Sequence, residues 1–322
     1  FHFNPSVLHH IRSFAPEVLL QAGGWAIPTT VLTVIFNRFI GRPLTCFWSE
    51  SHSREIRELA GLKERLWSAG RRAVYRRFDA FAVPGRFAAE FVDSVSGQVT
   101  TKIFLPNVVA EDIYALAYYR RQERKDEMRQ ALNIAADRLV YVIPARLVPK
   151  KAVLAFLRAT ESILSDFPVT ILIAGDGPER SRVDVWTHDH PDADVRLLGQ
   201  LPTQQLVDIY TISDYLVLPS IADPNPLTIV EALWAGLPLL LSDRVGNWPE
   251  TLVDGQNGFL FDPLQKESIC QALMRSIEAS DDWRIHAGKL SFSIAQKRFS
   301  APKVAEQLIR DLCELKEGKL SR

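Results

Sequence analysis

The sequence predicts an α/β protein in which helices cover both faces of parallel sheets. Its second half alternates short runs of branched apolar residues with segments of helical period. The runs are almost wholly apolar, as expected of parallel strands that are buried on both faces. The composition agrees, because 322 residues with 47% hydrophobic and 24% charged side chains are typical of a globular protein of about two domains.

The expected elements follow from this alternation. Helical patterns at 152–164 and 203–213 lie between strands that we expect in the second half at 138–143, 169–175, 195–199, 215–220 and 237–243. The same alternation is sparser before Pro106, with strands expected at 17–22, 42–48, 79–85 and 101–106.

This organisation predicts two α/β domains and two further segments. We expect a first, acceptor-side domain over 1–109, a charged, helix-favouring connector over 110–137, a second domain over 138–299, and a carboxy-terminal helix over 300–322 that can return to the first domain.

Charge and cysteine content exclude several classes. The formal net charge is zero, so no global field favours nucleic acid. Cys46, Cys270 and Cys313 are odd in number and lack metal-ligand spacing, which fits a reducing cytosol and argues against a disulfide framework or a zinc site. The longest apolar run, 25–36, is too short to cross a membrane, so we expect a cytoplasmic protein.

Polar residues follow the apolar runs, where α/β sheets bind their ligands. Arg146 and Lys151 follow the run at 138–143, and a Gly-Asp-Gly-Pro turn at 175–178 follows the next one. Taken singly, such residues are more often solvated or part of a plain connection. Their shared place at one sheet edge favours a site.

Two carboxylates stand eight positions apart, at Asp223 and Glu231, on either side of a rigid turn that contains Pro226. A helix is expected to follow over 227–234, and its first amides favour an anion. Glu231 can accept hydrogen bonds from vicinal hydroxyls such as those of ribose. Equally, Asp223 can cap the turn and Glu231 can stabilise the helix dipole.

Residues 138–278 resemble the donor-binding domain of retaining glycosyltransferases of family four, which have the GT-B architecture of two facing Rossmann-like domains. The segments that carry the resemblance are "ARLVPKK", "LIAGDGPE", "VRLLGQLP", "YLVLPS", "DPNPLTIVEALWAGLPLLLSD" and "GNWPETLVDGQNGFLFDP". The paired acids of that family, normally two glutamates, fall on Asp223 and Glu231. The chain departs from the family's pattern at Asp223, Asn225, Pro226 and Ala152.

The resemblance implies an enzyme that transfers a sugar from a nucleoside diphosphate donor with retention and needs no metal or other cofactor. Arg146 and Lys151 would stabilise the leaving phosphate, Asp223 would hold sugar hydroxyls, and Glu231 would hold the ribose. The further donor-binding candidates are Gly175, Asp176, Gly177, Asn225, Leu227 and Thr228.

The acceptor side offers less. His52 follows an expected strand and is a candidate for contact with the acceptor or the sugar, although a lone histidine is more often structural. The basic segment 62–78 can rest on an anionic membrane, which would suit a glycan acceptor linked to lipid, or it can be an ordinary surface helix.

Two rival functions remain: a sugar-nucleotide epimerase of the same architecture, and a pseudoenzyme that only binds nucleotide. The first 25 residues resemble the middle of a GT-B acceptor domain rather than its beginning. We therefore expect an incomplete first domain and a longer native chain upstream of Phe1. The chain as given should still bind a nucleoside diphosphate but transfer a sugar poorly or not at all.

Overall fold

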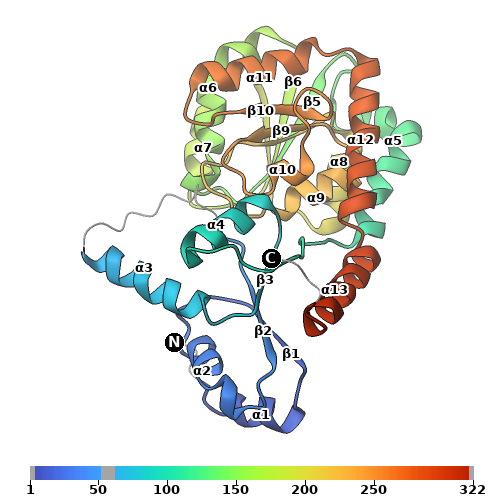
Figure 1. Cartoon of the computed structure of the whole chain (residues 1–322). Helices are drawn as coiled ribbons and strands as arrows, with labels where there is room; N and C mark the ends of the chain where they lie inside the picture. The colour runs from blue at the N-terminus through green and yellow to red at the C-terminus, as the bar shows by residue number, and fades with distance from the viewer. Residues whose placement is uncertain (1–3, 52–61, 319–322) are drawn as a thin grey trace. The chain divides into compact units, whose positions relative to one another are not determined.

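The computed structural model describes residues 4–51 and 62–318 of the chain (Figure 1). These residues form two compact units, one made of Phe1–Pro106 with Pro302–Arg322 and the other of Asn107–Ala301. Each unit holds one parallel sheet with helices packed against it, which is the α/β class that the sequence predicted.

The first unit contains a four-stranded parallel sheet in the order β1-β2-β3-β4. Its elements are α1 (Val7–Phe14), β1 (Val18–Gln21), α2 (Pro28–Ile35), the 3-10 turn η1 (Asn37–Phe39), β2 (Leu44–Trp48), α3 (Leu62–Tyr75), β3 (Ala80–Val83), α4 (Arg86–Ser96), β4 (Lys102–Phe104) and α13 (Ala301–Lys316). Every strand expected before Pro106 is present, shortened by a residue or more at its ends.

Both faces of this sheet are covered. Phe47 of β2 and Phe81 of β3 lie in an aromatic cluster. Its other members are Tyr75, the last residue of α3, and Phe78 just after this helix. On the other face, Cys46 and its buried neighbours Ala80, Ala82 and Ile103 pack against the leucines of α13. Burial among these apolar groups raises the pKa of the Cys46 thiol to about 12, so this cysteine is an inert core residue.

The second unit contains a six-stranded parallel sheet in the order β10-β9-β8-β5-β6-β7. Its elements are α5 (Glu111–Ala131), β5 (Leu139–Pro144), η2 (Pro149–Lys151), α6 (Val153–Asp166), β6 (Val169–Ala174), α7 (Arg180–Asp189), β7 (Asp194–Gly199), α8 (Thr203–Ile212), β8 (Tyr215–Leu218), α9 (Leu227–Trp234), β9 (Leu239–Ser242), α10 (Trp248–Thr251), β10 (Gly258–Phe261), α11 (Lys266–Glu278) and α12 (Asp281–Arg298). All of the strands expected here are found, and β10 is an additional one.

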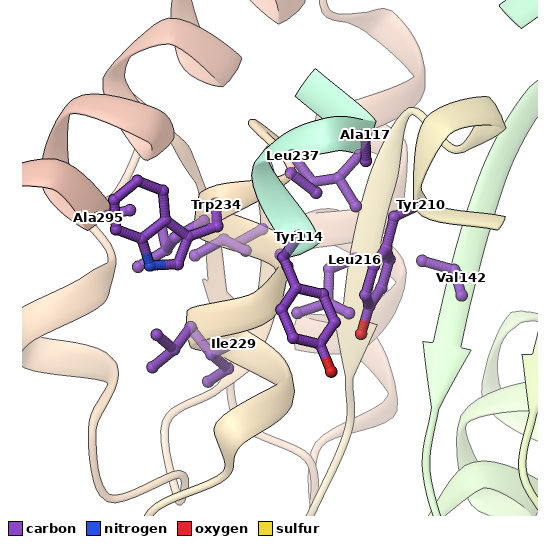
Figure 2. Packing of buried hydrophobic residues seen from close by; sticks show 14 of the residues in the cluster. Tyr114, Ala117, Val142, Tyr210, Leu216, Ile229, Trp234, Leu237 and Ala295 are labelled. Atoms are coloured by element: carbon purple, nitrogen blue, oxygen red, sulfur yellow. The ribbon is translucent and has the colours of Figure 1, made fainter. Parts of the chain in front are cut away.

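Alternate residues of the strands enter two separate cores. In β5, Val140 and Val142 face the cluster made with α5, α8, α9 and α12, while Tyr141 and Ile143 face the cluster made with α6, α7 and α11. The labelled residues of the first cluster are shown in Figure 2. Two covered faces explain why these strands are apolar along their whole length.

The segment 110–137, which we expected to be a connector, lies within the second unit. Most of it forms α5, which packs against α8 and α9. The charges that suggested a solvated linker are partly buried, because Lys125 and Arg129 reach Asp214 at 2.6 and 2.7 Å. Asp214 also accepts a hydrogen bond at 2.8 Å from the amide of Val140, at the start of β5. This network fastens α5 to the sheet.

The charge state of Asp214 follows from the same contacts. Burial alone would raise the pKa of its carboxyl group, but Lys125, Arg129 and the amide of Val140 outweigh burial and hold the pKa below its usual range. Asp214 is therefore a charged residue inside the protein, compensated by two cations of one helix.

We expect Asp214→Asn to lower the free energy of unfolding by about 3–5 kcal/mol, because it leaves the buried Arg129 and the partly buried Lys125 without their counter-charge. Urea unfolding measures the loss. Asp208→Asn is the matched control: Asp208 pairs with Arg120 on the same helix, but its side chain is 41% exposed, so its removal should cost less than about 1 kcal/mol. Equal losses in the two variants would show that the buried network does not stabilise α5.

Candidate active site at the carboxyl edge of the second sheet

The strand order of the second unit reverses direction at β5. This strand pairs with β6 on one side and with β8 on the other, so the chain leaves it in opposite directions in the two halves of the unit. In open parallel sheets, such a switch point opens a crevice at the carboxyl ends of the strands, and ligands bind there. The loops that end β5, β6, β8 and β9 meet at this edge.

Backbone hydrogen bonds join these loops to one another. Leu147 N donates to Asp176 O at 2.9 Å, which links the loops after β5 and β6. Ile221 N donates to Lys150 O at 2.9 Å, which links the loops after β8 and β5. Gly246 N donates to Asp223 O at 2.8 Å and brings in the loop after β9. The edge is therefore one connected layer of main chain.

Gly175 and Gly177 allow this close approach. A Cβ at Gly175 would collide with the carbonyl oxygen of Ala145, and one at Gly177 would collide with that of Leu147. The sequence suggested these glycines as donor-binding residues, and the structure gives them a packing role beside the Arg146 loop. Asp176, between them, is exposed and accepts hydrogen bonds from Gly177 N at 2.6 Å and Arg180 at 3.2 Å.

The two cations predicted at this edge differ in environment. The Arg146 side chain is exposed and makes no hydrogen bond or ion pair with the residues that the structure describes. Lys151 is mostly buried and its Nζ forms an ion pair with Asp223 Oδ2, although the two residues are 72 positions apart. The structure thus brings Lys151 and the first of the paired acids into direct contact.

The lysine is held by an unusual backbone conformation. Pro149–Lys151 form a 3-10 turn, and the next residue, Ala152, has φ 53° in the left-handed region before α6 begins. Left-handed backbone is strained for residues with a Cβ and costs roughly 1–2 kcal/mol. This is the position where the sequence has alanine in place of the family's glycine.

The start of α9 carries polar atoms that point to a ligand. Leu227–Trp234 is helical, as predicted, and Pro226 precedes it without an amide hydrogen. The side-chain oxygens of Ser220, Thr228 and Asn247 are buried and lack a hydrogen-bond partner among the described residues. Asn247 meanwhile donates to Pro226 O at 3.2 Å. The sequence analysis did not name Ser220 or Asn247 as candidates. Their positions shortly after the strands β8 and β9 could have indicated them.

Glu231 is held by two tyrosines. Tyr114 on α5 donates to one of its carboxylate oxygens at 3.0 Å, and Tyr210 on α8 donates to the other at 2.7 Å. Burial raises the pKa of Glu231, and the two hydroxyl groups act in the opposite direction. The sequence predicted Glu231 but gave no sign of either tyrosine, since Tyr114 is 117 positions away.

The remaining candidates concern the acceptor. His52 lies outside the described residues. In the basic segment, Arg72 and Arg76 donate at 3.1 and 2.8 Å to the carbonyls of Val95 and Ser96, so they cap the end of α4. Leu66 is exposed on the same helix, α3. Across the described ranges, none of the helices is both long enough and apolar enough to cross a membrane.

The sequence and the fold match a known class of protein. Residues 124–286, just over half of the chain, match the family described as glycosyl transferases group 1. The chain therefore belongs to the group 1 glycosyltransferases, and its two parallel-sheet units agree with the GT-B fold of its structural neighbours.

Individual relatives share part of their length with it. The lipopolysaccharide 1,2-N-acetylglucosaminetransferase of Salmonella typhimurium is 26% identical over 239 residues, which cover 70% of this chain and 59% of the relative. A D-inositol 3-phosphate glycosyltransferase of Saccharomonospora viridis is 31% identical over 159 residues, 46% of this chain and 36% of the relative. The structure of Anabaena HepE with UDP has a TM-score of 0.74 at 18% identity and covers 96% of this chain and 81% of its own.

We expect Ala152→Gly to raise the free energy of unfolding by up to about 1 kcal/mol, because glycine adopts the left-handed conformation without a Cβ clash. The control is Ala155→Gly, at an exposed position inside the same helix α6, which should instead cost roughly 1 kcal/mol. Chemical denaturation of both variants gives the comparison. A loss of stability in both would contradict the strain assigned to Ala152.

Proposed function

We propose that this protein transfers a sugar from a nucleoside diphosphate donor to an acceptor hydroxyl, with retention of the anomeric configuration and without a metal ion. The observation that carries the proposal is the ion pair between Lys151 and Asp223, which joins the loops after β5 and β8 at the carboxyl edge of one sheet. Membership in the group 1 glycosyltransferases supports it.

The leaving group explains the cations. When the bond between the sugar and the diphosphate breaks, negative charge grows on the phosphate and positive charge grows on the anomeric carbon. Arg146 offers a planar fork of donors that is exposed at the edge, and Lys151 offers a compact charge. Together with the first amides of α9, these groups stabilise the diphosphate as it leaves. In this proposal they take the place of a divalent cation.

In this proposal, the diphosphate replaces Asp223 as the ionic partner of Lys151 when the donor binds. Without a ligand, Asp223 neutralises Lys151 in a mostly buried setting. A diphosphate brings its own negative charge to Lys151 and releases the Asp223 carboxylate, which can then accept hydrogen bonds from sugar hydroxyls. Asp223 therefore serves the empty and the occupied site in turn.

Glu231 and the orphaned polar atoms complete the donor site. Glu231 accepts hydrogen bonds from ribose hydroxyls, and Thr228 and Ser220 supply hydroxyl groups that have no partner among the described residues. For the base we propose uridine first, because structural neighbours of this chain were solved with UDP and with UDP-glucose. Guanosine and adenosine remain the comparison ligands.

For the acceptor we propose a glycan, free or linked to lipid, at the cytoplasmic face of a membrane. The Salmonella relative is named for transfer to lipopolysaccharide, which supports such an acceptor. Leu66 and Trp67 are exposed on the basic helix α3 and are the surface that would meet the lipid. The rival functions differ in product: an epimerase leaves the diphosphate attached to an altered sugar, and a pseudoenzyme releases nothing.

The test is release of nucleoside diphosphate from the donor by wild type and by two variants. We expect Arg146→Ala and Lys151→Ala each to raise the barrier by about 2–4 kcal/mol, as loss of one strong oxyanion donor does. Lys150→Ala removes an exposed lysine next to Lys151 and should leave the rate unchanged. Unaltered kinetics in both site variants would remove Arg146 and Lys151 from the mechanism.

Titration calorimetry separates the roles of the two acids, with UDP, GDP and ADP compared first on wild type. Glu231→Ala should weaken the bare diphosphate and the intact sugar nucleotide alike, because both carry the ribose. Asp223→Ala should weaken mainly the sugar nucleotide, because only its sugar reaches the loop after β8. Equal losses of affinity for the bare diphosphate in the two variants would show that these roles are wrong.

A further inference from the structure

Two tyrosines from different helices meet on one carboxylate. Tyr210 is fully buried and Tyr114 is 9% exposed, and their hydroxyls donate to the two separate oxygens of Glu231. Figure 2 shows the two rings side by side in the core with both hydroxyl groups pointing the same way. The helices α5 and α8 that carry them pack directly on each other.

This arrangement differs from the usual way in which a buried tyrosine is satisfied. Tyr215, in the same unit, donates at 2.8 Å to the carbonyl oxygen of Ser276, and Tyr141 pairs at 2.9 Å with the Ser276 hydroxyl. In both cases the partner of the buried phenol is a neutral group of Ser276 on α11. Glu231 instead places a carboxylate in a mostly buried setting, where the cost of burying its charge is offset only in part by the two tyrosine hydroxyl groups.

The geometry fixes how many further hydrogen bonds the Glu231 carboxylate can accept. A carboxylate has about four acceptor positions, two on each oxygen. One position on each oxygen is taken by a tyrosine, so one remains on each, and the side chain is partly exposed rather than sealed. Because both oxygens are held, the carboxylate cannot rotate, and the two remaining positions stay side by side.

We propose that Tyr114 and Tyr210 are positioning residues that fix Glu231 as a two-point acceptor for the vicinal 2′- and 3′-hydroxyls of a ribose, so that the site selects ribonucleotides over 2′-deoxyribonucleotides. The proposal rests on the function given above and adds its specificity determinant. The tyrosines act through Glu231 and do not themselves touch the nucleotide.

The same two hydroxyl groups lower the pKa of Glu231 and so favour its ionised form. Burial raises the pKa of Glu231, and the groups that oppose burial are Tyr210 on α8 and Tyr114 on α5. From α10 and α12, which also pack on α9, no described charged side chain contributes to this balance. Loss of either hydroxyl therefore raises the pKa of Glu231 further. A protonated Glu231 would no longer accept two hydroxyl groups.

The first measurement compares UDP with 2′-deoxy-UDP by calorimetry. Wild type should prefer UDP by about tenfold to a hundredfold, the value of one hydrogen bond to a charged group. In Tyr210→Phe and Tyr114→Phe this ratio should fall by about tenfold. Tyr141→Phe, which removes a buried hydroxyl with a neutral partner, should keep it. A ratio that stays at the wild-type value in both Tyr210→Phe and Tyr114→Phe would overturn the proposal.

The second measurement needs no ligand and follows stability against pH. Because the folded pKa of Glu231 is raised, its charge destabilises the fold above that pKa and has no effect below the unfolded value of 4.5. Removing a tyrosine donor enlarges the penalty, so Tyr210→Phe should lose clearly more thermal stability at about pH 7 than at about pH 4. Tyr141→Phe should lose the same at both.

The two measurements separate the outcomes. If the wild-type protein bound UDP and 2′-deoxy-UDP equally, the ribose role of Glu231 would be wrong and this inference with it, whatever the stability data show. A second outcome is that wild type prefers UDP, that Tyr210→Phe keeps this preference, and that its loss of stability does not depend on pH. The proposed function would then stand, and the positioning role of Tyr114 and Tyr210 would be overturned.

Discussion

The reversal of strand order at β5 in the second sheet is the constraint on which the candidate site depends. Because β6 and β8 lie on opposite sides of β5, the loop after β5 is hydrogen-bonded to the loop after β6 on one side and to the loop after β8 on the other. The first of these contacts needs main chain to approach main chain closely, which Gly175 and Gly177 permit beside Ala145 and Leu147. The position of Lys151 above the sheet follows from that contact.

Charge is compensated at both ends of this sheet, in different ways. At the amino ends of β5 and β8, Asp214 is closed off by Lys125, Arg129 and an amide, which is a structural arrangement. At the carboxyl edge, Lys151 and Asp223 neutralise each other while Arg146 is exposed and Glu231 is held by neutral hydroxyls. The proposed exchange of partners with an anionic ligand rests on the second arrangement, whereas the first joins α5 to the sheet.

Much of the fold was predictable because strands buried on both faces leave an unbroken apolar run in the sequence. The runs at 169–175 and 215–220 appear as β6 and β8 with small changes at their ends. The strand β10, Gly258–Phe261, was missed because four residues that include a glycine carry little periodic signal. The helix α5 was taken for a connector because its buried charges cannot be told from solvated ones by composition.

The sequence by itself predicted the α/β class of the protein and a site at the carboxyl edge of its second sheet, because Arg146, Lys151 and Asp223 follow apolar strands. It also gave Glu231 as a candidate, inside the helix that follows Asp223. Only the tertiary structure decided their partners. Lys151 meets Asp223 across 72 positions, and Tyr114 meets Glu231 across 117. Local pattern records which residue faces a core or an edge, but contacts between distant segments arise from how helices and strands pack, and that information is absent from any single stretch of sequence.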